Sequence, residues 1–366
     1  MDVINKSAYK HCIFKKQGQT DWLDVLVVKA TFSLRPTELV TLSEIQDDII
    51  LGDQFDGPMA PHPLKSVISS EGDLVAFKPE TDLILTGTAE SYRRQLCESW
   101  TAEISLGPIS KLVRLCRPET FYRHSSQHPW VSRGVTPTNR VTLDDRLALG
   151  GCFAADVDDE QATCHFTPNP AGTGWLPQLD ERSSLSTHQK EYVIAQCNEI
   201  QELNAPQIRQ PGHAYHPDNT GGYINLTARP RWVSSRESWQ GTYDRHWLTQ
   251  QYPAYPRDFN PLYWQAVAED QRANPWLKGD EVLTLNGLLS EGDRTFRLPN
   301  EGIIAVVTRA DQQQVVMLPV LDTIRVDLDR RIINLVWRMH GRQQNPMTHV
   351  TLTNYPLNQL HGGLWS

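Results

Sequence analysis

Short strand-like runs near both ends of the chain limit its fold more than any other sequence feature. Residues 25–34 are rich in β-branched and aromatic side chains, and the alternating runs 102–106 and 109–115 flank Gly107-Pro108, which predicts a β-hairpin. Further short runs, broken by Gly, Pro, Asn or Asp, are residues 83–88, 281–285, 295–298, 303–308, 315–318, 323–328 and 331–337. This pattern is typical of a sandwich or barrel. It predicts a mainly β fold of two packed antiparallel β lobes with few helices.

Helix patterns are confined to two segments. Asn260 suits an N-cap and Pro261 suits the first helical position, so we expect a helix over residues 260–272. Residues 186–199 form the second candidate, and the Pro- and Gly-rich residues 204–222 predict a loop.

The chain has 366 residues, enough for one large hydrophobic core or two modest ones. We expect one continuous module over residues 1–366, with a β-rich N-terminal lobe at 1–178 and a loop and helix connector at 179–206. An aromatic segment and a β-rich C-terminal lobe then occupy residues 207–366.

Charge and hydropathy exclude several classes of partner. The net charge is -8 with acids and bases interspersed, so no basic face for nucleic acid is expected. The N-terminus lacks the basic and apolar regions of a signal peptide, and no run reaches the roughly 20 apolar residues of a membrane helix. We therefore expect a cytoplasmic protein that has neither nucleic acid nor membrane as a partner.

Catalytic and metal-binding patterns are incomplete. The sequence contains no G-x-S-x-G motif and no C-x-x-C pair, and its glycine-rich stretch near Gly174 is not followed by Lys-Ser or Lys-Thr. His213 and His216 lie in a Pro- and Gly-rich loop, where helical metal-ligand geometry is not expected. We predict a non-enzymatic protein with no catalytic, cofactor-binding or metal-binding residues.

The densest group of aromatic residues lies between residues 239 and 264. Aromatic and arginine side chains dominate the binding energy of protein interfaces, so this segment is a candidate partner-binding site. Its candidate residues are Trp239, Tyr243, Arg245, Trp247, Tyr252, Tyr255 and Arg257.

Two other interpretations of this segment stay open. The rings can form an internal core in which Asp244 and Asp258 accept hydrogen bonds from buried backbone donors. Alternatively, the rings over residues 239–264 can stack on a sugar while Asp244 or Asp258 supplies acid or base catalysis, as in a carbohydrate-binding or glycoside-processing protein.

An ordered series of short segments resembles one bacterial family of unknown function that is encoded beside type VI secretion effectors. The similarity covers roughly residues 20–310 and rests on the order of the segments. They include Phe77-Lys-Pro-Glu-Thr-Asp82, Asn169-Pro-Ala-Gly172, Trp232 with Arg236, Gly241-Thr-Tyr-Asp244, Pro256-Arg-Asp-Phe259 and Ala268-Glu-Asp-Gln271.

The resemblance implies a cytoplasmic adaptor or chaperone. Such a protein binds and stabilises a secreted effector, at its PAAR-type or other N-terminal delivery region, and helps to load it onto the PAAR-tipped spike. The spike protein is a second possible partner, and a structural role in the secretion baseplate is a further alternative. The family supplies no catalytic residues.

Overall fold

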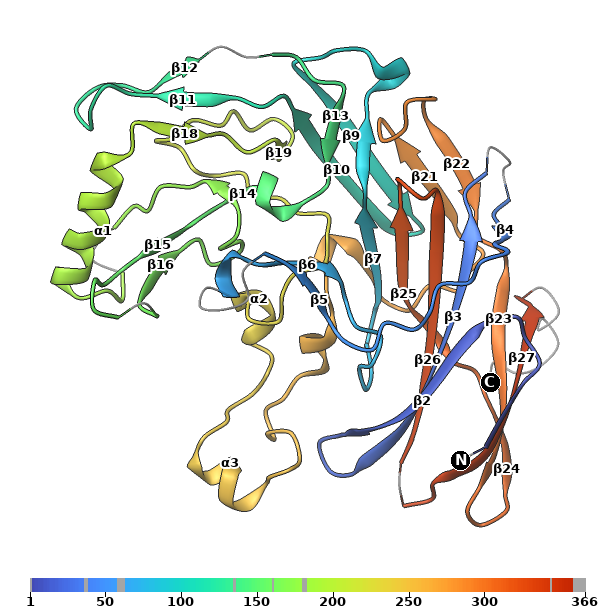
Figure 1. Cartoon of the computed structure of the whole chain (residues 1–366). Helices are drawn as coiled ribbons and strands as arrows, with labels where there is room; N and C mark the ends of the chain where they lie inside the picture. The colour runs from blue at the N-terminus through green and yellow to red at the C-terminus, as the bar shows by residue number, and fades with distance from the viewer. Residues whose placement is uncertain are drawn as a thin grey trace.

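β-strands form most of the regular structure of the chain (Figure 1). The computed structural model describes residues 2–35, 39–57, 63–133, 136–159, 161–179, 183–342 and 344–357. Within these ranges there are three α-helices, and several sheets pack together without closing into a barrel. The predicted mainly β fold is confirmed.

The largest sheet has seven strands. Six follow the order β2-β3-β26-β25-β7-β20, and a seventh, β4, pairs with β3. The pairing of β25 with β7 is parallel, and the other pairs are antiparallel. The strands are β2 (Lys10–Gln17), β3 (Trp22–Ser33), β4 (Thr41–Leu42), β7 (Thr81–Thr86), β20 (Arg272–Ala273), β25 (Val320–Asp327) and β26 (Ile332–Arg342).

Two further sheets have five and four strands, in the orders β19-β10-β9-β21-β22 and β1-β27-β23-β24. The predicted hairpin around Gly107 is confirmed, because Leu106 lies opposite Ile109 and Gly107 has a φ of 56° that favours glycine. The strands are β9 (Ser99–Leu106), β10 (Ile109–Cys116), β19 (Ile208–Arg209), β21 (Val282–Asn286), β22 (Arg294–Arg297), β1 (Asp2–Asn5), β23 (Glu301–Arg309), β24 (Gln314–Met317) and β27 (Met347–Pro356).

Short strands form the rest of the β-structure. A three-stranded sheet has the order β12-β11-β18, and the remaining strands make the pairs β13-β8, β14-β17, β15-β16 and β5-β6. Their bounds are β5 (Gln54–Asp56), β6 (Val67–Ser70), β8 (Thr88–Glu90), β11 (Thr120–Tyr122), β12 (Val131–Arg133), β13 (Arg140–Thr142), β14 (Leu149–Gly150), β15 (Cys152–Ala154), β16 (Thr163–His165), β17 (Thr173–Gly174) and β18 (Glu202–Asn204).

The helices test both helix predictions. The helix predicted over residues 186–199 is confirmed by α1 (Thr187–Glu199), which starts at a reciprocal capping box of Ser186 and Gln189. The other α-helices are α2 (Ser234–Glu237) and α3 (Arg245–Gln250). Five 3-10 turns complete the helical structure: η1 (Pro63–Lys65), η2 (Tyr92–Arg94), η3 (Asp145–Leu147), η4 (Pro261–Trp264) and η5 (Glu269–Gln271).

The predicted helix over residues 260–272 is wrong beyond its first turn. Asn260 caps the start as expected, accepting a hydrogen bond from the Leu262 N–H at 2.9 Å, but only η4 and η5 form. Asp82 is the reason. Its carboxylate accepts the side-chain amide of Gln265 at 2.9 Å and the backbone N–H of Ala266 at 2.8 Å, which a continuing helix would use internally.

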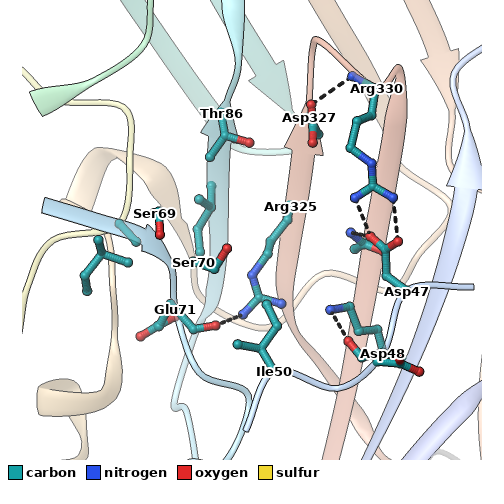
Figure 2. A pocket seen from close by; sticks show the side chains of 15 residues that line it. Asp47, Asp48, Ile50, Ser69, Ser70, Glu71, Thr86, Arg325, Asp327 and Arg330 are labelled. Atoms are coloured by element: carbon teal, nitrogen blue, oxygen red, sulfur yellow. Dashed lines mark hydrogen bonds and ion pairs between the residues drawn. The ribbon is translucent and has the colours of Figure 1, made fainter. Parts of the chain in front are cut away.

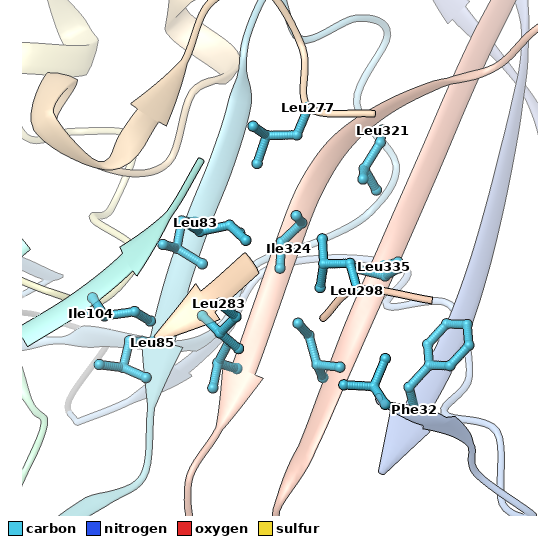
Figure 3. Close-up of a cluster of buried hydrophobic side chains, with 14 of the residues drawn as sticks. Phe32, Leu83, Leu85, Ile104, Leu277, Leu283, Leu298, Leu321, Ile324 and Leu335 are labelled. Atoms are coloured by element: carbon cyan, nitrogen blue, oxygen red, sulfur yellow. The ribbon is translucent and has the colours of Figure 1, made fainter. Parts of the chain in front are cut away.

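One hydrophobic core joins the large sheets. Alternate residues of the seven-stranded sheet, such as Leu83 and Ile324, point into it and meet Ile104 and Leu283 from the five-stranded sheet (Figure 3). Both expected lobes therefore contribute to the same core. The lobe boundaries themselves stay a prediction, and the expected 1–178 lobe, 179–206 connector and 207–366 lobe each include residues outside the described ranges.

The opposite face of the seven-stranded sheet carries polar and charged side chains, and it is buried as well. Lys29 and Arg338 on this face are 1% and 2% exposed, and Asp82 is fully buried. The segments around Asp48 and Asp73, which lack long strands, cover this face. Lys29 Nζ donates to the Asp48 carbonyl at 2.9 Å, and Arg338 Nη2 donates to the Asp73 carbonyl at 3.0 Å.

Candidate functional site

Residues 239–260, here called the aromatic arm, leave the sheets after α2 and return at η4. In Figure 1 the arm projects at the lower left, with α3 at its far end. Its two ends meet at its base, where the Asn260 N–H donates to the Trp239 carbonyl at 2.9 Å.

A bond between its two sides sets the path of the arm. Asp258 accepts hydrogen bonds from the Thr242 backbone N–H at 3.0 Å and from the Thr242 hydroxyl at 2.7 Å. The same bonds, led by that from the backbone N–H, lower the pKa of Asp258. Gly241 precedes this contact with a φ of 83°, and a Cβ at this position would lie 2.9 Å from the Pro256 ring. A side chain is therefore excluded at residue 241.

Trp247 is the centre of the outer half of the arm. Asp244 caps α3 by accepting the Trp247 N–H at 2.7 Å, and the indole Nε1 donates to the Ala254 carbonyl at 2.8 Å. The ring of Trp247 lies 4.6 Å from the ring of Tyr243 and 5.7 Å from that of Tyr252, in edge-to-face geometry. These three rings form a tip cluster on the outer half of the arm.

The tip cluster presents apolar surface to solvent. Tyr243 is 47% exposed and Tyr252 is 66% exposed, while Trp247 is half-buried between them. Leu248 on α3 is 59% exposed and adds an aliphatic side chain to this surface. Leu248 was not among the candidate residues, because one aliphatic residue beside Trp247 carries no sequence signal of exposure.

Tyr255 belongs to the base of the arm and not to the tip. Its ring stacks on Phe259 at 4.4 Å and lies 6.2 Å from Trp264, in a cluster that also includes Val75. Burial raises the pKa of Tyr255 to about 12. The Tyr255 N–H also donates to the carbonyl of Gly18, in the turn between β2 and β3, at 3.3 Å.

The seven candidate residues therefore separate by position. Trp239 is 40% exposed at the base of the arm, and Arg245 and Arg257 are exposed. No described carboxylate forms an ion pair with the guanidinium of Arg245 or of Arg257. Asp244 and Asp258, the two candidate acids, both accept backbone N–H groups of the arm. Partner binding by the seven residues stays a prediction.

Several segments that carry the family resemblance form buried ion pairs and hydrogen bonds. Lys78 Nζ contacts Asp82 at 2.7 Å and Glu71 at 2.9 Å, and Arg236 Nη2 contacts Glu71 at 3.3 Å. Burial acts to raise the pKa of Glu71, but Lys78 and Arg236 hold it below its usual range. Gln271 is fully buried, and its amide donates to the carbonyls of two neighbouring chain segments. These residues hold the polar face of the seven-stranded sheet to its cover.

Neither a metal-binding cluster nor a membrane-spanning helix is present in the described part of the chain. No group of three or more His, Cys, Asp and Glu side chains there has the arrangement to hold a metal ion. No helix in those ranges combines the length and the apolar character needed to cross a membrane.

Comparison with known protein families gives one match. A family model described as an uncharacterized protein conserved in bacteria, DUF2169, matches residues 20–338. The chain belongs to the DUF2169 family. The matched range contains the whole aromatic arm and most of the two largest sheets. Comparison with curated proteins finds no match, and comparison with solved structures finds none. The predicted membership of an uncharacterised bacterial family is confirmed, and the DUF2169 description states no function.

Proposed function

We propose that this DUF2169 protein is a non-enzymatic adaptor that binds another protein through the tip of its aromatic arm. The observation that carries the proposal is the exposed apolar surface of Tyr243, Leu248 and Tyr252 around Trp247. Tyrosine and tryptophan supply large contact areas at a low cost in conformational entropy, because only the two side-chain torsions χ1 and χ2 have to be fixed on binding. Arg245 and Arg257 are also exposed on the arm, form no ion pairs among the described residues, and can make charge-assisted contacts.

The rigidity of the arm also supports its proposed role in binding. Hydrogen bonds to Asp244, Asp258 and the Ala254 carbonyl hold the outer half in one conformation. The base is held to the sheets by Tyr255 and by Gln19, whose side-chain amide donates to the Phe259 carbonyl at 2.8 Å. A surface that is ordered before contact loses little entropy on binding.

The partner that we propose is a type VI secretion effector, bound at its PAAR-type or other N-terminal delivery region. In this role the protein is a chaperone that stabilises the effector and helps to load it onto the PAAR-tipped spike, with the spike protein as a second possible partner. The support is the ordered set of segments that resembles the family of such adaptors, together with the absence from the sequence of a complete catalytic motif.

Carbohydrate binding is the less favoured alternative. Acid and base catalysis on a sugar needs two carboxyl groups free to act at the bond that breaks. Asp244 caps α3 and Asp258 accepts hydrogen bonds from Thr242, so both carboxylates stabilise the conformation of the arm. Titration with oligosaccharides is the direct check, and neither hydrolysis nor chemical-shift changes at the arm are expected.

The proposal is tested by expressing the chain together with an effector and a PAAR-type protein encoded beside it. We expect a complex that survives affinity capture and size-exclusion chromatography and that raises the soluble yield of the effector. Tyr252→Ala combined with Leu248→Ala should weaken this complex. Tyr92→Ala is the matched control, because Tyr92 is 54% exposed on η2 and lies outside the arm. An effector that is equally soluble alone, with no co-elution, would contradict the adaptor function.

A further inference from the structure

A tight turn over residues 91–95, outside the aromatic arm, presents two consecutive arginines on the surface. Arg93 and Arg94 both have a φ of 54°, in the left-handed region of backbone conformation. Residues other than glycine rarely adopt this conformation, because it brings their Cβ too close to a carbonyl oxygen. Strained residues of this kind persist only where the surrounding structure holds them, and they are concentrated at binding sites and switches.

Backbone hydrogen bonds from neighbouring segments hold the turn. The Arg93 N–H donates to the Ser290 carbonyl at 2.7 Å, and the Arg94 N–H donates to the Ser91 carbonyl at 2.9 Å. The side-chain amide of Asn139 donates to the Arg94 carbonyl at 3.1 Å. None of these three bonds uses an arginine side chain. Both side chains are exposed, and that of Arg94 is 67% exposed.

Arg140 extends the positive surface beside the turn. It is exposed and lies directly opposite Glu90 in the β8-β13 pair. Side chains that lie opposite one another in an antiparallel pair are on the same face of the sheet. Arg94 Nε also contacts Glu90, at 3.2 Å, and the Glu90 side chain is only 20% exposed. One largely covered carboxylate therefore lies between two arginines.

The bases around the turn outnumber the acids. Glu291 pairs with Arg331 at 2.7 Å, and Asp293 and Asp329 each accept a backbone N–H at 3.0 Å. With Glu90 they are the four acids of residues 88–95, 138–140 and 287–294 and of the charged groups that contact these segments. The five bases of the same group are Arg93, Arg94, Arg140, Arg294 and Arg331. Five bases minus four acids leave one excess positive charge.

Arg93 and Arg140 are open to an external partner. Neither forms an ion pair with a described carboxylate, and the Arg93 guanidinium lies 5.0 Å from the centre of the Tyr92 ring. Arg330 shows the contrast, because its side chain is 54% exposed but contacts Asp47 at 2.6 Å (Figure 2). Exposed guanidinium groups without an internal carboxylate can form charge-assisted, two-pronged hydrogen bonds to a carboxylate of another molecule.

We propose that this turn binds a short acidic segment of a partner protein. Carboxylates of the segment accept hydrogen bonds from the guanidinium groups of Arg93 and Arg140, while Arg94 stays paired with Glu90. Leu96, which is 64% exposed, adds apolar contact area beside them. The backbone of the turn is ordered before contact, so little entropy is lost on binding.

The overall charge favours a short acidic segment over nucleic acid. A nucleic acid needs a broad basic face, whereas this chain has a net charge of -8 and the turn offers a small patch. No residue of the aromatic arm belongs to the patch, so this surface goes beyond the proposed adaptor site and does not depend on it.

The first test titrates the full chain by calorimetry with a blocked peptide of four Glu-Gly repeats at constant ionic strength. We expect saturable binding, and a peptide of four Gln-Gly repeats should bind about tenfold more weakly because it lacks the charges. Equal binding of the two peptides, or no binding of the acidic one, would overturn the proposal. Tighter binding of a thymidine decanucleotide than of the acidic peptide would also overturn it.

A double glycine variant separates binding from a structural role. Arg93→Gly with Arg94→Gly removes two charges, but glycine adopts the left-handed conformation without strain. We expect about tenfold weaker binding of the acidic peptide with no fall in melting temperature. Lys15→Gln with Arg342→Gln is the matched control, because it removes two exposed charges at the end of the seven-stranded sheet away from β8. An equal loss of affinity in both variants would refute a specific site.

Arg140→Gln keeps the test decisive if the glycine variant does not fold. Arg140 lies outside the turn, and its side chain forms no ion pair among the described residues, so its replacement leaves the fold intact. The variant should bind the acidic peptide more weakly than the wild type. Binding with wild-type affinity to a folded Arg140→Gln variant would contradict the proposed surface.

Discussion

The buried carboxyl group of Asp145 should make the protein less stable as the pH rises from about 4 to 7. Asp145 is 5% exposed on η3, and the Asn225 amide nitrogen lies 3.3 Å and 3.5 Å from its two carboxylate oxygens. Burial raises the pKa of Asp145 from 3.8 to about 6. The folded protein therefore holds this proton more tightly than the unfolded chain does. The resulting stability is fully present below the unfolded pKa and is lost as the pH rises through the folded pKa.

The size of the effect follows from the same values. One pKa unit corresponds to about 1.36 kcal/mol, so a difference of roughly two units contributes about 3 kcal/mol at low pH. Asp145→Asn removes the titration while keeping the shape. The new amide can also donate to Asn225 Oδ1, which accepts no hydrogen bond from the described part of the chain. We expect the variant to equal the wild type near pH 4 and to be more stable by up to about 3 kcal/mol near pH 7.5.

Urea unfolding at pH 4.5, 5.5, 6.5 and 7.5 measures this difference in the free energy of unfolding. Asp258→Asn is the matched control. The pKa of Asp258 is lowered by its bonds from Thr242, so its contribution is present at neutral pH and is lost as the pH falls. Both pKa values of Asp258, folded and unfolded, lie below pH 4.5, so Asp258→Asn should be less stable than the wild type by a nearly constant amount across this series, whereas the advantage of Asp145→Asn should grow as the pH rises. A constant difference between wild type and Asp145→Asn across the series would refute the reasoning.

Two further predictions concern the charged framework and the arm. Lys78→Met leaves Glu71 and Asp82 without their shared cation, and it should lower the free energy of unfolding by about 3–5 kcal/mol in urea titrations; a loss below about 1 kcal/mol would contradict a buried network. Tyr255→Ala should cost about 2 kcal/mol or more of stability because its ring packs at the base of the arm. Tyr252→Ala should change stability by less than about 0.5 kcal/mol but weaken partner binding by about 2 kcal/mol, as thermal melts and affinity titrations of the two variants will show.

The strands were predictable because their residue pattern matches their environment. Residues 102–106 and 109–115 alternate between apolar and polar side chains, and they form β9 and β10 with one face in the core. The helix over residues 260–272 failed for a reason that no local pattern contains. A carboxylate from Asp82, far away in the chain, takes the N–H of Ala266 and stops the helix. Tertiary contacts of this kind override local preference.

The polar face of the seven-stranded sheet is a second feature that could not be predicted from the sequence. Lys29, Arg325 and Arg338 have the residue types of a solvent-facing strand surface, yet all three are covered. Their burial depends on segments without long strands, whose position the sequence does not reveal. The burial of this charged face could therefore not be predicted from the sequence.

The aromatic arm was predictable only as a region. Aromatic density identified residues 239–264, and the choice between exposed anchors and an internal core stayed open for each ring. The structure places Tyr252 at the exposed tip and Tyr255 at the packed base, although only Pro253 and Ala254 separate them. The turn that separates them depends on long-range bonds to Asp258 and Gly18, which composition does not encode.

The seven-stranded sheet is buried on both faces, and this affects how the stability of the protein depends on temperature. Exposure of apolar surface raises the heat capacity on unfolding, whereas exposure of polar surface lowers it. The charged face around Lys29, Arg325 and Arg338 therefore offsets part of the heat-capacity change that the apolar face produces. The cost of desolvating such charges also falls as temperature rises. A sheet with one apolar face and one partly charged face thus gives a flatter dependence of stability on temperature than two apolar faces would.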